Sequence, residues 1–164
     1  MKTKEDIRWE IQWLFQGNKT HNREVSDKNI MEKILWYVEG KNISTICLYE
    51  SLSDEVDTKI IIQKLSNKWY KILVPKMISP TEMILIEISS RKPYSWEIDI
   101  FFIPGRAFSL KNDRLGRGKW YYDRFLSQKK YNKSKKIGVC YDFQILENIP
   151  VEEYDVTMNS LMHS

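Results

Sequence analysis

A segment rich in glycine and cationic residues, 113–124, carries the chemistry that this sequence shows most clearly. Gly116 and Gly118 stand one residue apart, so the backbone around them can approach an anion closely. A helix that begins just after them would add partial positive charge where a phosphate lies. The cations beside these glycines are Arg114, Arg117 and Lys119. Because arginine suits bidentate contacts and lysine acts as a mobile point charge, this mixture favours a polyphosphate over a single carboxylate.

Asp123 follows these cations and is placed to bind a magnesium ion beside such a phosphate. Magnesium is bound by one or two carboxylates together with phosphate oxygens and water, and it needs no dense protein cage. The alternative is a glycine-containing surface turn with solvated charges, because two glycines at this spacing are a weak motif. The spacing alone leaves both interpretations open.

A second basic segment, 129–136, contains five lysines around Tyr131, and the chain as a whole has a net charge of +4. This charge favours an anionic ligand without identifying it. Binding of nucleic acid through 129–136 is one alternative, and a solvated loop between a helix and a strand is the interpretation we favour. Most of the six tryptophans and nine tyrosines lie beside other apolar residues, as in a core, so we expect no nucleic-acid partner.

The elements that must position these residues begin with helices. Apolar residues at helical spacing predict a first helix around Ile7–Phe15, ended by Gly17-Asn18. A second helix is predicted over 30–38, with Asn22 or Ser26 as its N-cap and Gly40 at its end. Further helical spacing covers 57–69 and a run that ends near Gln128.

Strands are predicted from apolar runs rich in residues of high β-propensity: 43–49, 70–74 with a stop at Pro75, 83–88, 98–103 and 137–141. The strand-helix-strand unit over 43–74 implies parallel strands with a right-handed crossover, and hence an α/β fold with a mostly parallel central sheet. The run 98–103 is typical of a central strand. It would bring Pro104-Gly105 to the carboxyl edge of the sheet, where open α/β folds bind ligands.

The chain has 164 residues, and we expect one domain over 1–164. No stretch approaches the run of about 18 apolar residues that a membrane span needs, and the charged start lacks a signal-peptide pattern. We therefore expect a cytoplasmic protein that has no membrane partner and acts as a monomer. Cys47 and Cys140 lie in apolar runs without CxxC spacing, which predicts buried free thiols.

A resemblance to a known family extends along the chain. Ile103-Pro104-Gly105, Phe108 and the runs 114–119 and 121–124 resemble the signature of the 5-formyltetrahydrofolate cyclo-ligase family, also called methenyltetrahydrofolate synthetase. Further matching positions are Lys4, Ile7, Arg8, Tyr49, Glu55, Val74, Pro75, Lys76, Met83, Gln144, Pro150 and Asp155. The resemblance implies a three-layer α/β/α domain. It also implies an enzyme that uses ATP and Mg²⁺ to convert 5-formyltetrahydrofolate into 5,10-methenyltetrahydrofolate, with release of ADP and phosphate.

The resemblance also assigns roles to residues. It places ATP against Lys4, Arg8, Arg114, Gly116, Gly118, Lys119 and Tyr122. It places the folate, with or without a polyglutamate tail, against Glu55, Arg117 and Tyr121. It gives magnesium to Asp123 and Asp155, and it makes Lys119 and Arg117 catalytic. The implied reaction is phosphoryl transfer from ATP to the formyl oxygen, attack by the folate N10, and loss of phosphate.

The sequence departs from the family pattern at a few positions. Trp120 stands where the family usually has glycine, at a position suited to positive φ. Asn112 replaces a turn glycine, which asparagine tolerates because it can adopt left-handed geometry. Ser109 and Asn159 replace aspartates. The main alternative to the enzyme is therefore a folate- or nucleotide-binding relic of the same family, followed by a basic nucleic-acid-binding module.

Overall fold

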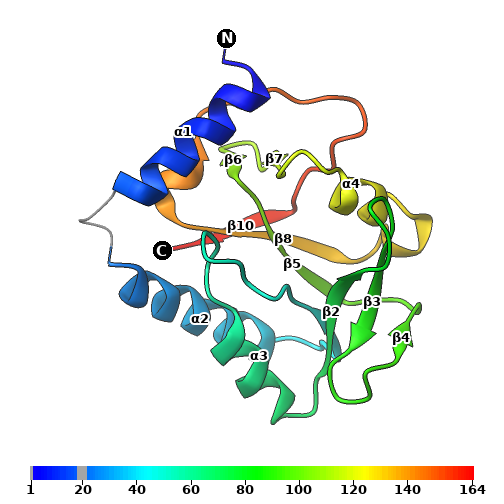
Figure 1. The fold of residues 1–164 in the computed structure, drawn as a ribbon. Coiled ribbons are helices and arrows are strands. Elements are labelled where there is room, and N and C mark those ends of the chain that lie inside the picture. The colour runs from blue at the N-terminus through cyan, green and yellow to red at the C-terminus, as the bar shows by residue number, and fades with distance from the viewer. Residues whose placement is uncertain (1, 18–21) are drawn as a thin grey trace.

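A seven-stranded sheet forms the centre of the structure, a computed structural model that describes residues 2–17 and 22–164 (Figure 1). In spatial order its strands are β10 (Ser160–His163), β8 (Lys135–Cys140), β5 (Ile100–Pro104), β1 (Thr45–Cys47), β2 (Lys71–Met77), β3 (Met83–Glu87) and β4 (Pro93–Tyr94). The first five run parallel, β3 runs antiparallel to β2, and β4 runs antiparallel to β3. The predicted α/β class with a mostly parallel sheet is confirmed.

Helices cover both faces of this sheet. On one face α2 (Arg23–Glu39) and α3 (Lys59–Ser66) pack against apolar strand residues that include Phe102. On the other face α4 (Tyr121–Leu126) and Tyr131 pack against a second set that includes Phe101. Neighbouring residues of a strand point to opposite faces, so both phenylalanines of β5 are buried and the strand is central, as its apolar run predicted.

The N-terminal helix α1 (Lys4–Gly17) lies away from α2 and α3 in Figure 1, beside a second, smaller sheet. That sheet has three strands: β7 (Arg114–Leu115), β6 (Ala107–Ser109) and β9 (Ile145–Leu146). Ile7 and Ile11 bury the inner face of α1 against Ala107 and Leu115. This packing fixes α1 beside the end of β7, which is where the glycine-rich segment begins.

Helix ends agree with the predictions where the chain is described. Asn22 caps α2, because its side chain accepts a hydrogen bond from the Val25 N–H at 3.3 Å, and Gly40 follows the last turn. Gly17 ends α1 as predicted, whereas Asn18 lies outside the described residues. The helix predicted over 57–69 is shorter, because α3 starts at Lys59 and ends at Ser66.

The prediction that β2 stops at Pro75 is wrong, since the strand continues to Met77. Strand β1 pairs with β2 only as far as Leu73, and Pro75 pairs with Leu85 on the β3 side. One side of β2 therefore has no strand partner at Pro75 within the described chain, and the missing N–H is tolerated as it is on an edge strand.

The basic segment 129–136 is only partly the solvated loop that was predicted. Residues Lys129–Tyr131 form a short 3-10 helix, η1, and β8 begins at Lys135. Lys136 is buried and donates hydrogen bonds to the carbonyl oxygens of Tyr131 at 2.8 Å and Ser134 at 3.4 Å. Burial lowers the pKa of its ammonium group. The other four lysines are exposed, as expected.

Both cysteines are buried free thiols, as predicted, and burial raises the pKa of Cys47 and of Cys140. Among the described residues, no helix is both long enough and apolar enough to cross a membrane.

Candidate active site

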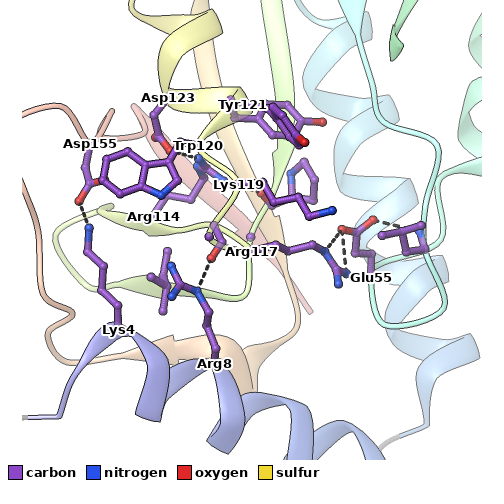
Figure 2. A pocket seen from close by; sticks show the side chains of 17 residues that line it. Lys4, Arg8, Glu55, Arg114, Arg117, Lys119, Trp120, Tyr121, Asp123 and Asp155 are labelled. Atoms are coloured by element: carbon purple, nitrogen blue, oxygen red, sulfur yellow. Dashed lines mark hydrogen bonds and ion pairs between the residues drawn. The ribbon is translucent and has the colours of Figure 1, made fainter. Parts of the chain in front are cut away.

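A cavity of about 290 Å³ opens between β5, the loop after β7, and the N-terminal end of α1 (Figure 2). The structure gathers every residue predicted for the site around this one cavity. Its lining comprises Lys4, Arg8, Leu52, Glu55, Pro104, Gly105, the run 114–123 and Asp155. Pro104 ends β5, so the cavity lies at the carboxyl edge of the sheet, as the topology predicts.

The loop between β7 and α4 is held by Arg8 and needs a glycine at position 118. Arg8 reaches from α1 and donates from Nε to the Gly116 carbonyl at 3.0 Å. Gly118 has φ of +89°, and a Cβ placed on it would lie 3.4 Å from the Arg8 guanidinium carbon. A side chain at Gly118 would therefore be strained and would crowd Arg8. Thus α1 holds the loop through Arg8 and places the Arg8 guanidinium group beside it.

Arg114 and Asp123 form a buried ion pair beneath the loop. The Arg114 Nη2 lies 2.8 Å from Asp123 Oδ2, and their side chains are 3% and 12% exposed. The other Asp123 oxygen accepts a hydrogen bond from the Val156 N–H at 3.3 Å. Arg114 Nε is buried and has no hydrogen-bond partner within the described residues. Arg114 stacks near the Tyr122 ring, 5.4 Å from its centroid, and burial raises the pKa of Tyr122.

Lys4 and Asp155 close one end of the cavity, although they are far apart in the sequence. Lys4 Nζ lies 2.6 Å from both Asp155 Oδ2 and Glu152 Oε2. Partial burial lowers the pKa of Lys4, but hydrogen bonds to Asp155 and Glu152 outweigh this, so the net shift is upward. Lys4 is therefore a firmly charged cation at this end.

Glu55 and Arg117 lie at the opposite end (Figure 2). Arg117 donates to Glu55 Oε1 from Nε at 3.2 Å and from Nη2 at 3.1 Å, and it also pairs with Asp54. Arg106 pairs with the same Asp54 carboxylate. Partial burial raises the pKa of Asp54, but the two arginines outweigh it and the net shift is downward. Asp54 and Arg106 were not predicted as site residues, although Asp54 directly precedes Glu55 in the sequence.

Lys119 differs from the other cations of the cavity. Its side chain is exposed, and it makes no hydrogen bond or ion pair within residues 2–17 and 22–164. The neighbouring Tyr121 is held by a hydrogen bond from its hydroxyl to the Pro80 carbonyl at 2.6 Å. Lys119 is thus the cation that can move toward a ligand without breaking a contact in the protein.

Trp120 adopts the left-handed conformation, with φ of 58° and ψ of 14°. This agrees with the expectation of a position suited to glycine, and it costs a residue with a Cβ roughly 1–2 kcal/mol. Its indole packs on Tyr154, with ring centroids 4.3 Å apart and planes at 34°. Asn112, with φ of 67°, takes the turn geometry expected of it. Tyr154 was not predicted as a site residue from the sequence.

The donor set near Lys4 fits magnesium only in company with phosphate. Within the described chain no group of three or more His, Cys, Asp or Glu side chains is arranged to hold a metal. Asp123 and Asp155 line the same cavity, and each is already paired with a cation. Two carboxylates suit a magnesium ion that keeps water and phosphate oxygens as its other ligands.

Comparison with known proteins agrees with this geometry. The model of the 5-formyltetrahydrofolate cyclo-ligase family matches residues 1–164. The 5-formyltetrahydrofolate cyclo-ligase of Mycoplasma pneumoniae is 38% identical over 120 residues, which cover 72% of this chain and 73% of the relative. A probable 5-formyltetrahydrofolate cyclo-ligase of Caenorhabditis elegans is 31% identical over 166 residues, covering 82% and 79%. A solved 5,10-methenyltetrahydrofolate synthetase from Mycoplasma pneumoniae superposes with a TM-score of 0.87 at 31% identity, covering 98% of each chain. The chain therefore belongs to the 5-formyltetrahydrofolate cyclo-ligase family.

Proposed function

We propose that this chain is an ATP- and magnesium-dependent 5-formyltetrahydrofolate cyclo-ligase, which forms 5,10-methenyltetrahydrofolate and releases ADP and phosphate. The observation that supports this most strongly is that all the residues assigned by the family resemblance line one cavity. At one end of it are a glycine-rich loop and cations suited to a polyphosphate, and at the other is a carboxylate held by an arginine. Two substrates can therefore meet between them.

The loop end of the cavity binds the nucleotide. Gly116 and Gly118 let backbone atoms approach the phosphates closely, while Lys4 and Arg8 supply fixed positive charge. Lys119, which has an exposed and mobile ammonium group, stabilises the charge that develops on the transferring phosphoryl group. Magnesium, held by Asp123 and Asp155 together with phosphate oxygens, would neutralise further phosphate charge there.

The opposite end orients the folate. Glu55 is nearly buried and is held by two hydrogen bonds from Arg117, so its carboxylate is fixed before a ligand arrives. A fixed carboxylate can accept paired donors from the edge of a pterin ring. Tyr121, tethered to Pro80, supplies an aromatic wall. Arg117 and Tyr121 thus position the formyl group of the folate toward the loop.

Three finer proposals accompany this function. The protein acts as a monomer, and every residue assigned to the site belongs to this one chain. It works in the cytoplasm, which suits its two buried free thiols. It favours polyglutamylated folates, because its lysine-rich surface attracts acidic tails. The last proposal fails if lengthening the tail leaves the KM for the folate unchanged at low salt.

The direct experiment follows absorbance in the methenyltetrahydrofolate band after mixing the protein with 5-formyltetrahydrofolate, ATP and magnesium. We expect product with the wild type and a loss of about a hundredfold or more in kcat for Lys119→Ala, because an electrostatic contact to the reacting group is removed. Lys133→Ala, which removes an exposed lysine of the basic segment, serves as the control and should keep full activity.

A second candidate function is a binder without catalysis, favoured by one observation: an indole occupies the loop where the family usually has glycine. This candidate predicts that ATP and the folate raise the melting temperature while no product forms. Absence of both product and stabilisation would overturn the proposed function entirely.

A further inference from the structure

Trp120 lines the cavity, but the proposed mechanism gives its side chain no role. It holds a backbone conformation that glycine would adopt without strain, yet it carries the largest side chain. Strain of this kind persists where the surrounding structure imposes it, and it is often found at ligand-binding positions. The location of the indole therefore needs an explanation.

The indole forms a wall of the cavity at the Lys4 end. It lines the cavity and remains 44% exposed, while Tyr154 supports it at a centroid distance of 4.3 Å. Lys4 Nζ lies 5.9 Å from the centroids of both rings. In Figure 2, Trp120 lies beside Asp155, and Glu55 lies at the far end of the cavity. The aromatic surface is thus separated from the folate end.

This arrangement suits a flat aromatic group joined to a polyphosphate. Lys119 and the glycine-rich loop line the cavity next to the indole, and the proposed function places the phosphates against them. The exposed part of the indole offers a stacking surface, which accepts any nucleobase because every base has a π-face. Tyr154 restricts the indole before binding, so less rotamer freedom is lost when a base stacks.

We propose that Trp120, supported by Tyr154, is a stacking platform for the base of the bound nucleoside triphosphate. This inference rests on the proposed function, because it assumes that the nucleotide occupies the loop end of the cavity. It makes Trp120 a determinant of nucleotide affinity that acts on the base and leaves the phosphates to Lys4, Arg8 and Lys119.

Calorimetric titration with ATP and with inorganic tripolyphosphate, both with magnesium, separates base contacts from phosphate contacts. For Trp120→Gly we expect about a tenfold weaker affinity for ATP and an unchanged affinity for tripolyphosphate, because only ATP has a base to stack. Trp120→Phe keeps an aromatic ring and should stay within about threefold of the wild type. Arg91→Gly changes another left-handed residue, with φ of 58° and outside the cavity lining, and should leave both affinities unchanged.

Tyr154→Ala gives an independent test that leaves the loop sequence intact. We expect ATP to bind about threefold more weakly and tripolyphosphate to bind as before, because the indole loses its support. Equal weakening of both ligands in Trp120→Gly would mean that the residue only shapes the loop, and tighter ATP binding would mean that the indole obstructs the site. Either result overturns the inference alone. A wild type that binds neither ligand overturns the proposed function as well.

Discussion

At the scale of single residues, the site is built from charges that are already paired inside the protein. Lys4 is paired with Asp155, Arg114 with Asp123, and Arg117 with Glu55 and Asp54. Paired charges are held in place, which suits groups that position a ligand. Lys119 has no such partner in the described chain, so its ammonium group can move without breaking a contact within the protein.

The Arg114–Asp123 pair supports a prediction about stability. Asp123→Ala should lower the free energy of unfolding by about 3 kcal/mol, because removing one partner leaves the other charge buried and uncompensated. Urea denaturation without magnesium measures this effect apart from any role of Asp123 in binding the metal. The double variant Arg114→Met/Asp123→Leu should recover part of the loss. If Asp123→Ala is as stable as the wild type, the pair does not support the loop.

At the scale of elements, ion pairs join short segments that are distant in sequence at the Glu55 end of the cavity. Asp54 lies in the segment between β1 and α3. Its carboxylate forms ion pairs with Arg117, in the loop after β7, and with Arg106, in the turn between β5 and β6. One carboxylate thus joins three connections that surround the cavity.

The ion pairs of Asp54 predict that the free energy of unfolding depends on pH. The pKa of Asp54 is lowered from its ordinary value of 3.8, so its stabilising contribution is present above that value and is lost as pH falls through the lower folded-state pKa. Asp54→Asn should cost about 1 kcal/mol at neutral pH, and the difference from the wild type should vanish at acid pH. Glu97→Gln, at an exposed carboxylate, is the control. A difference that persists unchanged in acid would contradict the electrostatic explanation.

Gly138 of β8 lies directly against the Phe108 side chain of β6, in the smaller sheet. A Cβ at Gly138 would clash with the Phe108 ring and would lie 2.8 Å from Leu161 Cδ2. Gly138→Ala should therefore destabilise the protein by about 1–3 kcal/mol through overpacking, measured by thermal or urea denaturation. Gly40→Ala, where the nearest atom would be 3.6 Å away, should change stability by no more than about 0.5 kcal/mol. Equal effects at the two positions would contradict this account.

At the scale of the whole molecule, the cavity lies beside the most buried part of the sheet. Every residue of β5 is buried, and β5 pairs with β1 and β8 on its two sides. Amide hydrogens in β5 and β8 should exchange only through global unfolding, whereas those of the outer strand β4 should exchange faster through local opening. Hydrogen exchange followed by NMR measures this order. Slower exchange in β4 than in β5 would contradict the layered arrangement.

The main helices and strands were predictable from the sequence because each corresponds to a continuous pattern of apolar residues several residues long. The apolar runs 98–103 and 137–141 gave the central strands, and helical spacing gave α1 and α2. The two- and three-residue strands of the smaller sheet carry no periodicity, so they were missed.

The residues of the candidate site were predicted from the sequence, but the ion pairs and ring contacts that hold them in place were not. Glycines and cations at close spacing in 114–123 marked the loop. The contacts of Asp54 and Tyr154 depend on which loops the fold brings together, and no local pattern encodes that.

The link between Lys4 and Asp155 also affects how the protein is made. Their side chains meet across 151 positions of sequence, so the first residue of α1 must wait for almost the whole chain before its partner is synthesised. At translation rates of about 5–20 residues per second, that wait is roughly 8–30 seconds. During this time α2, α3, β1 and β2 are already made, but the Lys4 end of the cavity is incomplete. Strands β8 and β10 are also made late, so the central sheet and this end of the cavity should be completed together, close to the end of synthesis.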